Sequence, residues 1–487
     1  MPSLPIRSHA VAHLLGQFLL MMSATMLVPL VFTLQGGSDS PRPMLIGFAA
    51  TVLAGGLLAF VSRQPETELS TREALLTVVI VWFSVAFFGS LPFYFSPYFA
   101  SLTDALFEAA SGFTTTGATI LVDVEVLPAS LQFWRHFSHW LGGMGIIMLG
   151  IAILPLVGVG GKTLYNAQFA GAPSEKLKPR VLETAHALWR VYLALTIAEF
   201  VALYGAGMSS FDAICHTFST LGTGGFSTRT ASIAHYDSLT IELILVAFMI
   251  VSSLNFASQY RMWVERHPRS FLRDPEVRFH LAVLTLATLA AAVTLVRHTG
   301  YPPGVALRQA VFQITSIGTT TGFATADYEL WHPLAQLTLL ALMYFGGNTS
   351  STAGGFKSFR VVLLLRVVHR AMALIVHRHR VMPVRVAGGV IPDTALTSLL
   401  NLVVLALIFN FFASLLLAAS GLDLLTSFSA VPACMFSVGP GLGSVGPAEN
   451  YAHLPIFAKW VLTFTMLVGR VEFYTALVLF TPLFWRK

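Results

Sequence analysis

Three Gly- and Thr-rich segments of this 487-residue chain have the residue types and spacing to bind a dehydrated cation. Each contains a key glycine with an Ala twelve residues before it and a Ser six residues before it. The three key glycines are Gly117, Gly225 and Gly322. Glycine adopts positive φ angles and permits close backbone approach, so carbonyl oxygens of such loops can point at one axis. Rings of backbone carbonyls replace the hydration shell of an ion in selective pores.

A fourth, degenerate copy follows Asp423. Its key glycine is either Gly439 or Gly441, and we favour Gly439 because the branched residue Val438 directly precedes it. Successive key glycines lie 108, 97 and 117 residues apart, which indicates an internal repeat. An ordinary Gly-rich turn explains any one segment but not four at matching positions. The predicted cation filter comprises Thr115, Thr116, Gly117, Thr223, Gly224, Gly225, Thr320, Thr321, Gly322, Ser437, Val438 and Gly439.

Each glycine segment is preceded by a short apolar stretch that predicts a helix entering the membrane without crossing it. Asp104 and Asp212 stand at the start of the first two stretches. A carboxylate there suits an N-cap or first-turn position, where the helix dipole is positive. The opposite, negative end of each helix then faces the cation.

Two further features predict a barrier on the same path. Small and polar residues interrupt the eighth apolar run, and such breaks within a membrane often mark ion sites. Arg470 lies within the last apolar run, where a charge is costly and normally faces a cavity or a partner. We favour a gate over a plain kink, and a pore-facing Arg470 over an i,i+2 pair with Glu472, because such residues do not face each other. The predicted gate comprises Gly346, Gly347, Asn348, Ser350, Ser351, Thr352, Gly354, Gly355, Lys357 and Arg470.

The elements that must position these residues are membrane-spanning helices. The chain is 55% hydrophobic and only 11% charged, less than half of the charged fraction usual in soluble proteins. Apolar runs long enough to span a bilayer recur throughout the chain. They cover residues 11–34, 43–61, 73–94, 131–157, 182–205, 238–262, 279–297, 330–345 with 356–376, 394–419 and 456–484.

Charge alternates between the loops that join these runs. Basic loops carry Arg63, Lys162–Arg180, Arg261–Arg278 and Lys357–Arg385, and the others are neutral or acidic. The positive-inside rule therefore places both termini in the cytoplasm. The net charge of +6 reflects this topology, so we predict no nucleic-acid partner. Neither a disulfide framework, since only Cys215 and Cys434 are present, nor an enzyme motif is indicated.

The four loops, the interrupted run and Arg470 together resemble the membrane subunits of Trk potassium-uptake systems, in the Trk/Ktr/HKT superfamily. The resemblance extends over nearly the whole chain. Its most specific stretches are residues 111–119, 139–145, 212–228, 318–323, 346–357 and 438–443. One departure is Ser350, where the family usually has Gly.

The resemblance implies an all-α polytopic protein with four pseudo-symmetric units, each a span, pore helix, loop and span, around one central pore. Two extra N-terminal spans would occupy residues 1–66, and the units residues 67–160, 161–270, 271–385 and 386–487. It implies potassium as the transported ion with no bound cofactor, an intramembrane gate, a homodimer in the bacterial inner membrane, and a cytosolic nucleotide-binding regulatory subunit. Passive and sodium- or proton-coupled transport both stay open. The alternatives are a secondary transporter for another small solute and a non-transporting membrane scaffold.

Overall fold

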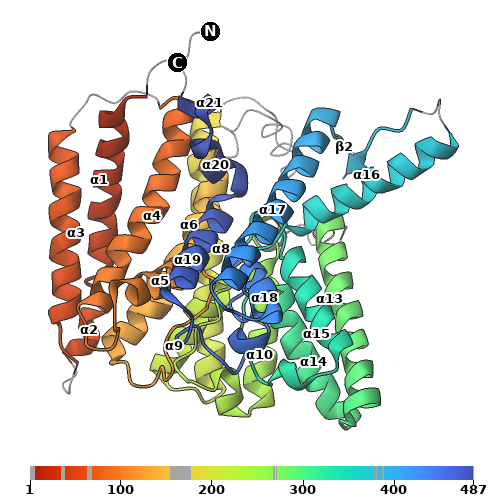
Figure 1. Ribbon diagram of the computed structural model, residues 1–487, viewed down its shortest axis with the longest axis horizontal. Coiled ribbons are helices and arrows are strands. Elements are labelled where there is room, and N and C mark those ends of the chain that lie inside the picture. Colours follow the sequence, from red (N-terminus) through yellow and green to blue (C-terminus); the bar gives the residue numbers. More distant parts are fainter. Residues whose placement is uncertain are drawn as a thin grey trace.

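A computed structural model describes residues 6–34, 39–62, 69–153, 177–266, 269, 271, 273–377, 379, 381–386 and 389–485. Most long helices have their axes roughly aligned, and α16 (Ser358–Val376) projects sideways from the body (Figure 1). The C-terminal helix α21 (Pro482–Trp485) lies at the same end of the molecule as the start of α1 (Ser8–Thr25). The basic residues expected between 162 and 176 are outside the described residues.

Six helical segments among the described residues are long and apolar enough to cross a membrane. An α-helix rises 1.5 Å per residue, so about 20 residues match the hydrocarbon thickness of a bilayer. The segments are α1 with α2 (Leu30–Thr33), α3 (Arg42–Val61), α4 (Thr71–Tyr94), Ala185–Gly205 of α8 (Leu177–Gly205), α13 (Pro275–Thr294) with the π-helical turn η2 (Leu295–Thr299), and α17 (Asp393–Ala419). The helix α6 (Ala129–Ile153) runs beside α8.

Three expected spans are broken rather than straight. Residues 238–262 form α10 (Leu239–Ser253) and α11 (Phe256–Trp263), which meet at 105°, because Asn255 caps a new helix by accepting the N–H groups of Ala257 and Ser258. Likewise α19 (Ile456–Val471) meets α20 (Phe473–Leu477) and η5 (Val478–Phe480) at 113°. The third break separates α15 (Pro333–Phe345) from α16, as expected from its small residues.

Four short helices precede the glycine segments: α5 (Leu102–Phe113), α9 (Ser210–Leu221), α14 (Pro303–Gly318) and α18 (Leu424–Met435). Ser101 and Ser209 cap α5 and α9, which puts Asp104 and Asp212 in the first turn, one of the two expected positions. Asp423 caps α18 by accepting the N–H of Thr426. Every capping oxygen satisfies a backbone donor that the helix itself leaves unpaired.

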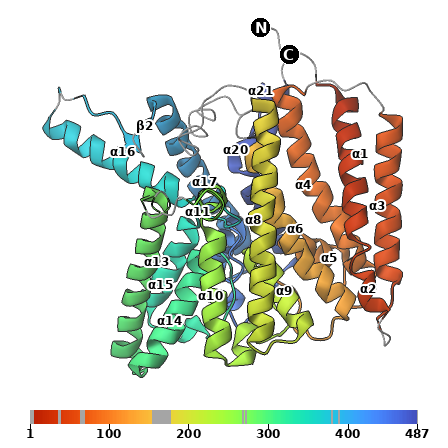
Figure 2. The ribbon, with the colours of Figure 1, turned by 180° about the vertical axis from the view of Figure 1, so that it is seen from behind.

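Small elements complete the chain. The 3-10 turns η1 (Ser232–Tyr236), η3 (Tyr328–Leu330) and η4 (Gly443–Val445) lie between the glycine segments and the following helices. The strands β1 (Arg385–Val386) and β2 (Gly389–Val390) pair antiparallel beside α16, so the described chain is not wholly helical. Figure 2 shows α8 beside α10, whereas α1 and α3 lie together at one edge of the molecule.

Candidate functional site: four glycine loops and the segment beside them

The glycine segments form four loops with one backbone conformation. We define loops 1 to 4 as residues 114–118, 222–226, 319–323 and 436–440. The second residue of each loop has a φ angle near +55° although it is not glycine, and the fourth is a glycine with φ between 76° and 96°. The residues are Thr115 and Gly117, Thr223 and Gly225, Thr320 and Gly322, and Ser437 and Gly439. Gly441 has no positive φ angle, so Gly439 holds the equivalent position in loop 4.

Each loop is bonded in the same way to the helix before it. The N–H of the third loop residue donates to the carbonyl five residues earlier, at 2.8 Å in every loop. The donors are Thr116, Gly224, Thr321 and Val438, and the acceptors are Ser111, Ser219, Ser316 and Ala433. These bonds use carbonyls at the C-terminal end of each helix that have no partner within the helix. Each loop is therefore fixed in the same way to the C-terminal end of the helix before it.

The four loops meet in a closed ring. A Cβ atom added to Gly117 would collide with the carbonyl oxygen of Gly224, one added to Gly225 with that of Thr321, and one added to Gly322 with that of Val438. The circle closes at Gly439, where an added Cβ would lie 2.6 Å from the carbonyl oxygen of Thr116. Each loop thus touches the next in chain order, and only glycine permits the approach.

A cavity of about 90 Å³ is lined by all four key glycines. Beside this cavity, an ion pair between α5 and α6 binds the segments that follow loops 1 and 2. Arg135 of α6 contacts Glu108 of α5 at 2.5 Å and donates to the carbonyl of Ser227 at 3.0 Å. Glu108 also accepts the N–H of Ile120 at 3.0 Å. Both charged side chains are almost fully buried, which is tolerated because their polar atoms are paired.

Each loop has its own side-chain support. In loop 1 the hydroxyls of Thr114 and Thr116 lie 2.8 Å apart, and those of Thr319 and Thr321 do the same in loop 3. Loop 2 instead packs against a histidine of α6. The ring of His139 stacks on that of Phe226 with centroids 4.1 Å apart.

Loop 4 is supported by residues of the segments around it. The hydroxyl of Tyr451 donates to the carbonyl of Gly439, and that of Tyr328 donates to Gly441. Glu329 accepts the N–H of Gly443. Burial raises the pKa of Glu329, the Gly443 N–H opposes this shift, and the carboxylate of Asp327 adds to it.

The segment that interrupts the α15–α16 span, residues 346–357, lies directly against the loops. The N–H of Gly354 donates to the hydroxyl of Thr320 in loop 3 at 2.7 Å. A Cβ added to Gly354 would collide with the carbonyl oxygen of Phe436 in loop 4. A second cavity, of about 70 Å³, lies beside this contact and is lined by Gly354, Ser437 and Arg470 among others. Two groups of residues that were expected to form filter and gate are therefore adjacent.

Arg470 lies in the last turn of α19, next to the break, which is near the middle of the expected run 456–484. Its guanidinium donates to the carbonyls of Thr352 and Gly142, both at 3.1 Å. No carboxylate pairs with it among the described residues, and Glu472 pairs instead with Arg360 at 2.8 Å. The guanidinium is therefore a buried charge that joins the 346–357 segment to α6.

The other expected gate residues lie along the same segment. Gly346, Ser350, Gly355 and Lys357 have positive φ angles. The Lys357 side chain donates to the carbonyl of Ala353, and the Ser351 hydroxyl donates to the carbonyl of Asn348. The expected gate residues within the segment are Gly346, Gly347, Asn348, Ser350, Ser351, Thr352, Gly354, Gly355 and Lys357.

Glu276 of α13 binds Thr349 of the 346–357 segment and Phe359 in the first turn of α16, and it was not singled out from the sequence. Its carboxylate accepts the N–H of Thr349 at 2.6 Å, the hydroxyl of Thr349 at 2.9 Å and the N–H of Phe359 at 3.1 Å. One helical turn later, His280 lies 3.0 Å from the hydroxyl of Ser253 and 3.3 Å from that of Ser358. The sequence did offer one signal for Glu276, which is a carboxylate at the start of an apolar run. If such a carboxylate is buried, it requires hydrogen-bond donors around it.

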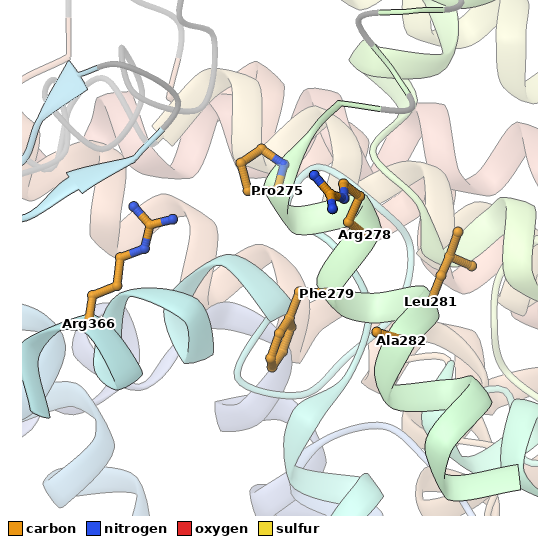
Figure 3. A pocket seen from close by; sticks show the side chains of 6 residues that line it. All are labelled: Pro275, Arg278, Phe279, Leu281, Ala282 and Arg366. Atoms are coloured by element: carbon orange, nitrogen blue, oxygen red, sulfur yellow. The ribbon is translucent and has the colours of Figure 1, made fainter. Parts of the chain in front are cut away.

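A wider depression of about 650 Å³ lies apart from this site. It is lined by five consecutive or nearby residues of α13, from Pro275 to Ala282, and by Arg366 of α16 (Figure 3). The glycine loops contribute none of its lining residues. We therefore assign the candidate site to the loops and the adjoining segment.

Comparisons with known proteins agree with this architecture. The family model TrkH, described as a cation transport protein, matches residues 42–487. The Trk system potassium uptake protein TrkH of Vibrio parahaemolyticus serotype O3:K6 is 40% identical over 483 residues, covering 98% of this chain and 99% of that protein. TrkH of Escherichia coli K12 is 38% identical over 481 residues, with the same coverage of both chains.

A solved structure is similar over the same length. The crystal structure of the potassium transporter TrkH from Vibrio parahaemolyticus has a TM-score of 0.91 and 38% identity, and the match covers 99% of this chain and 100% of that one. Together with the apolar helices, these similarities identify a multi-pass membrane protein. They also confirm the resemblance that the glycine segments indicated. The chain belongs to the TrkH family of cation transport proteins.

Proposed function

We propose that this protein takes up potassium ions across the bacterial inner membrane through a filter formed by loops 1 to 4. The observation that carries the proposal is the closed ring, in which a Cβ on each key glycine would meet a carbonyl oxygen of the next loop. Alternating positive and negative φ angles direct successive carbonyls to the same side of a loop, and a ring of such oxygens replaces the water around a cation. The names of the TrkH relatives add the choice of potassium.

The proposed architecture is four related units around one pore. The repeated backbone conformation and the shared 2.8 Å bond support the relation between the loops. We assign the units to residues 67–160, 161–270, 271–385 and 386–487, and residues 1–66 to two additional spans. Both termini are proposed to lie in the cytoplasm, in keeping with the basic loops.

The segment 346–357 is proposed to act as a gate for this pore. It packs against loops 3 and 4 through Gly354, and the charge of Arg470 lies next to it. A cation leaving the ring would meet this charge and the segment, which Glu276 holds at Thr349 and, just beyond it, at Phe359 of α16. Like charges repel strongly where water is scarce, so Arg470 supports a barrier. We further propose a homodimer and a cytosolic nucleotide-binding regulatory subunit, on the resemblance alone.

Potassium-dependent growth of an uptake-deficient bacterium tests the filter. Gly225→Ser places a side chain at a φ angle of +76° and against the Thr321 carbonyl, so growth at low potassium should fail. Gly205→Ser is the matched control, because a Cβ at Gly205 meets nothing within 4 Å. Equal growth of both variants, at equal amounts in the membrane, would remove the filter assignment.

A further inference from the structure

Loop 4 lacks the internal support that loops 1 and 3 share. Those two loops carry threonine at their first and third positions, and the hydroxyls lie 2.8 Å apart. The corresponding residues of loop 4 are Phe436 and Val438, which have no hydroxyl. Its backbone must therefore be held in place by other groups.

Two tyrosines from outside the loop supply donors to it. The hydroxyl of Tyr451 donates to the carbonyl of Gly439 at 2.7 Å, and that of Tyr328 donates to the carbonyl of Gly441 at 2.9 Å. Both side chains are buried, at 2% and 0% exposure. A buried tyrosine hydroxyl needs a partner, and here both partners lie in or directly after loop 4.

Tyr451 also joins loop 4 to the first unit. Its N–H donates to the carbonyl of Thr119 at 2.8 Å, and its ring packs on Phe107 of α5 with centroids 5.5 Å apart. An added Cβ on Gly439 would lie 2.6 Å from the carbonyl of Thr116. Tyr451 therefore holds the backbone of loop 4 at Gly439, where the ring closes between loops 4 and 1.

We propose that Tyr451 and Tyr328 are positioning residues that set the preference of the ring for potassium over sodium. This inference rests on the proposed function of the ring. Sodium is the smaller ion, so a loop that moves inward coordinates it better. A hydroxyl donor on the Gly439 carbonyl opposes that inward movement, and Tyr328 does the same two residues later at Gly441, directly after the loop.

The test is Tyr451→Phe, which removes one hydroxyl and keeps the ring. Potassium and sodium fluxes are measured with the purified full-length chain in lipid vesicles, together with the potassium concentration at half-maximal flux. We expect the potassium-to-sodium flux ratio to fall about three- to tenfold, the range available to one hydrogen bond. The half-saturating potassium concentration should rise, whereas the maximal flux should change less. Tyr328→Phe should lower the ratio in the same direction.

Tyr474→Phe is the matched control, because its hydroxyl donates to the Ser398 carbonyl at 3.0 Å, far from the loops in sequence and contacts. An unchanged ratio in both Tyr451→Phe and Tyr328→Phe, or equal losses of both fluxes, would overturn the positioning role alone. A wild-type chain that passes both ions equally would overturn this inference together with the potassium filter. If Tyr451→Phe does not fold, Tyr328→Phe decides.

Discussion

Four residues that are not glycine hold positive φ angles in the ring: Thr115 at 55°, Thr223 at 52°, Thr320 at 58° and Ser437 at 55°. Such a conformation costs about 1–3 kcal/mol per residue and persists only where surrounding contacts enforce it. The bonds from each loop to its own helix provide that enforcement. Backbone strain is thus concentrated where carbonyl direction matters.

Arg470 carries the first prediction. Arg470→Ala removes a buried charge and two bonds to the carbonyls of Thr352 and Gly142. Potassium flux through the purified chain, without a regulatory partner, should therefore rise severalfold. Arg470→Lys keeps the charge but cannot reach both carbonyls with the geometry of a guanidinium, so its flux should be intermediate.

Arg370→Ala is the control for Arg470, because Arg370 pairs with Asp393 at the surface, away from the four loops and the 346–357 segment. The barrier role fails if the flux of Arg470→Ala equals that of this control.

Individual residues differ in how much the sequence reveals about them. The four key glycines were predictable because their conformation excludes other residues and leaves a spacing in the chain. The partners of Arg470 were not, because they are backbone carbonyls 118 and 328 residues away, which carry no residue-specific pattern. The role of Tyr451 was not predictable for a similar reason, because the partner of its hydroxyl is a backbone carbonyl, which no residue type marks in the sequence.

At the scale of elements, the sequence located the apolar helices and the break between α15 and α16, but not the bends at Asn255 and Glu472. Residues 238–262 read as one apolar run, yet the helix turns through 105° at Asn255. Asparagine is a strong helix cap, which was the signal available. The bend at Glu472 follows Gly469 by three residues, and Glu472 holds a φ angle of 69° and pairs with Arg360.

The contact between Glu276 of α13 and the 346–357 segment gives a prediction about the stability of that segment. Glu276→Gln replaces a carboxylate that accepts three hydrogen bonds by an amide with a single acceptor oxygen. The conformation of residues 346–357 should be less stable, so potassium flux without a partner should increase. Proteolysis of the segment in detergent, measured alongside flux, should also be faster.

Glu265→Gln is the control for this change, since Glu265 is exposed and lies two residues after the end of α11. Wild-type flux and wild-type cleavage in Glu276→Gln would show that the carboxylate does not restrain the segment.

The pair between α5 and α6 gives a prediction about stability. Glu108→Ala leaves Arg135 buried without its counter-ion, which typically costs about 3–5 kcal/mol. Thermal unfolding in detergent should therefore shift clearly downward. Asp393→Ala breaks the exposed pair with Arg370 and should barely change it. Similar melting temperatures for the two variants would contradict the assigned role of the buried pair.

At the scale of the molecule, α1 and α3 pack on each other at one edge, away from the ring (Figure 1). A Cβ added to Gly55 would lie 3.0 Å from the carbonyl oxygen of Gly16, whereas one at Gly56 meets nothing within 4 Å. Gly55→Leu should separate these helices and cost about 1–3 kcal/mol, without changing the potassium-to-sodium ratio. Gly56→Leu should be tolerated, and thermal stability with paired flux measurements tests both.

A changed flux ratio in Gly55→Leu would mean that the α1–α3 pair shapes the ring after all. We expect the flux ratio to be independent of Gly55 because the α1–α3 pair lies at the edge of the molecule, apart from the ring. The comparison therefore distinguishes a loss of stability from a change in ion preference.

The ring also closes within one polypeptide, since the fourth loop meets the first at Gly439 and Thr116. In an assembly of four identical chains every substitution would appear four times around the axis. Here each loop has its own sequence within one chain. Loop 4 can therefore carry Phe436 and Val438 at the positions where loops 1 and 3 carry threonine. In the proposed filter, a substitution in one loop therefore changes one quarter of the ring and leaves the other three loops as they are.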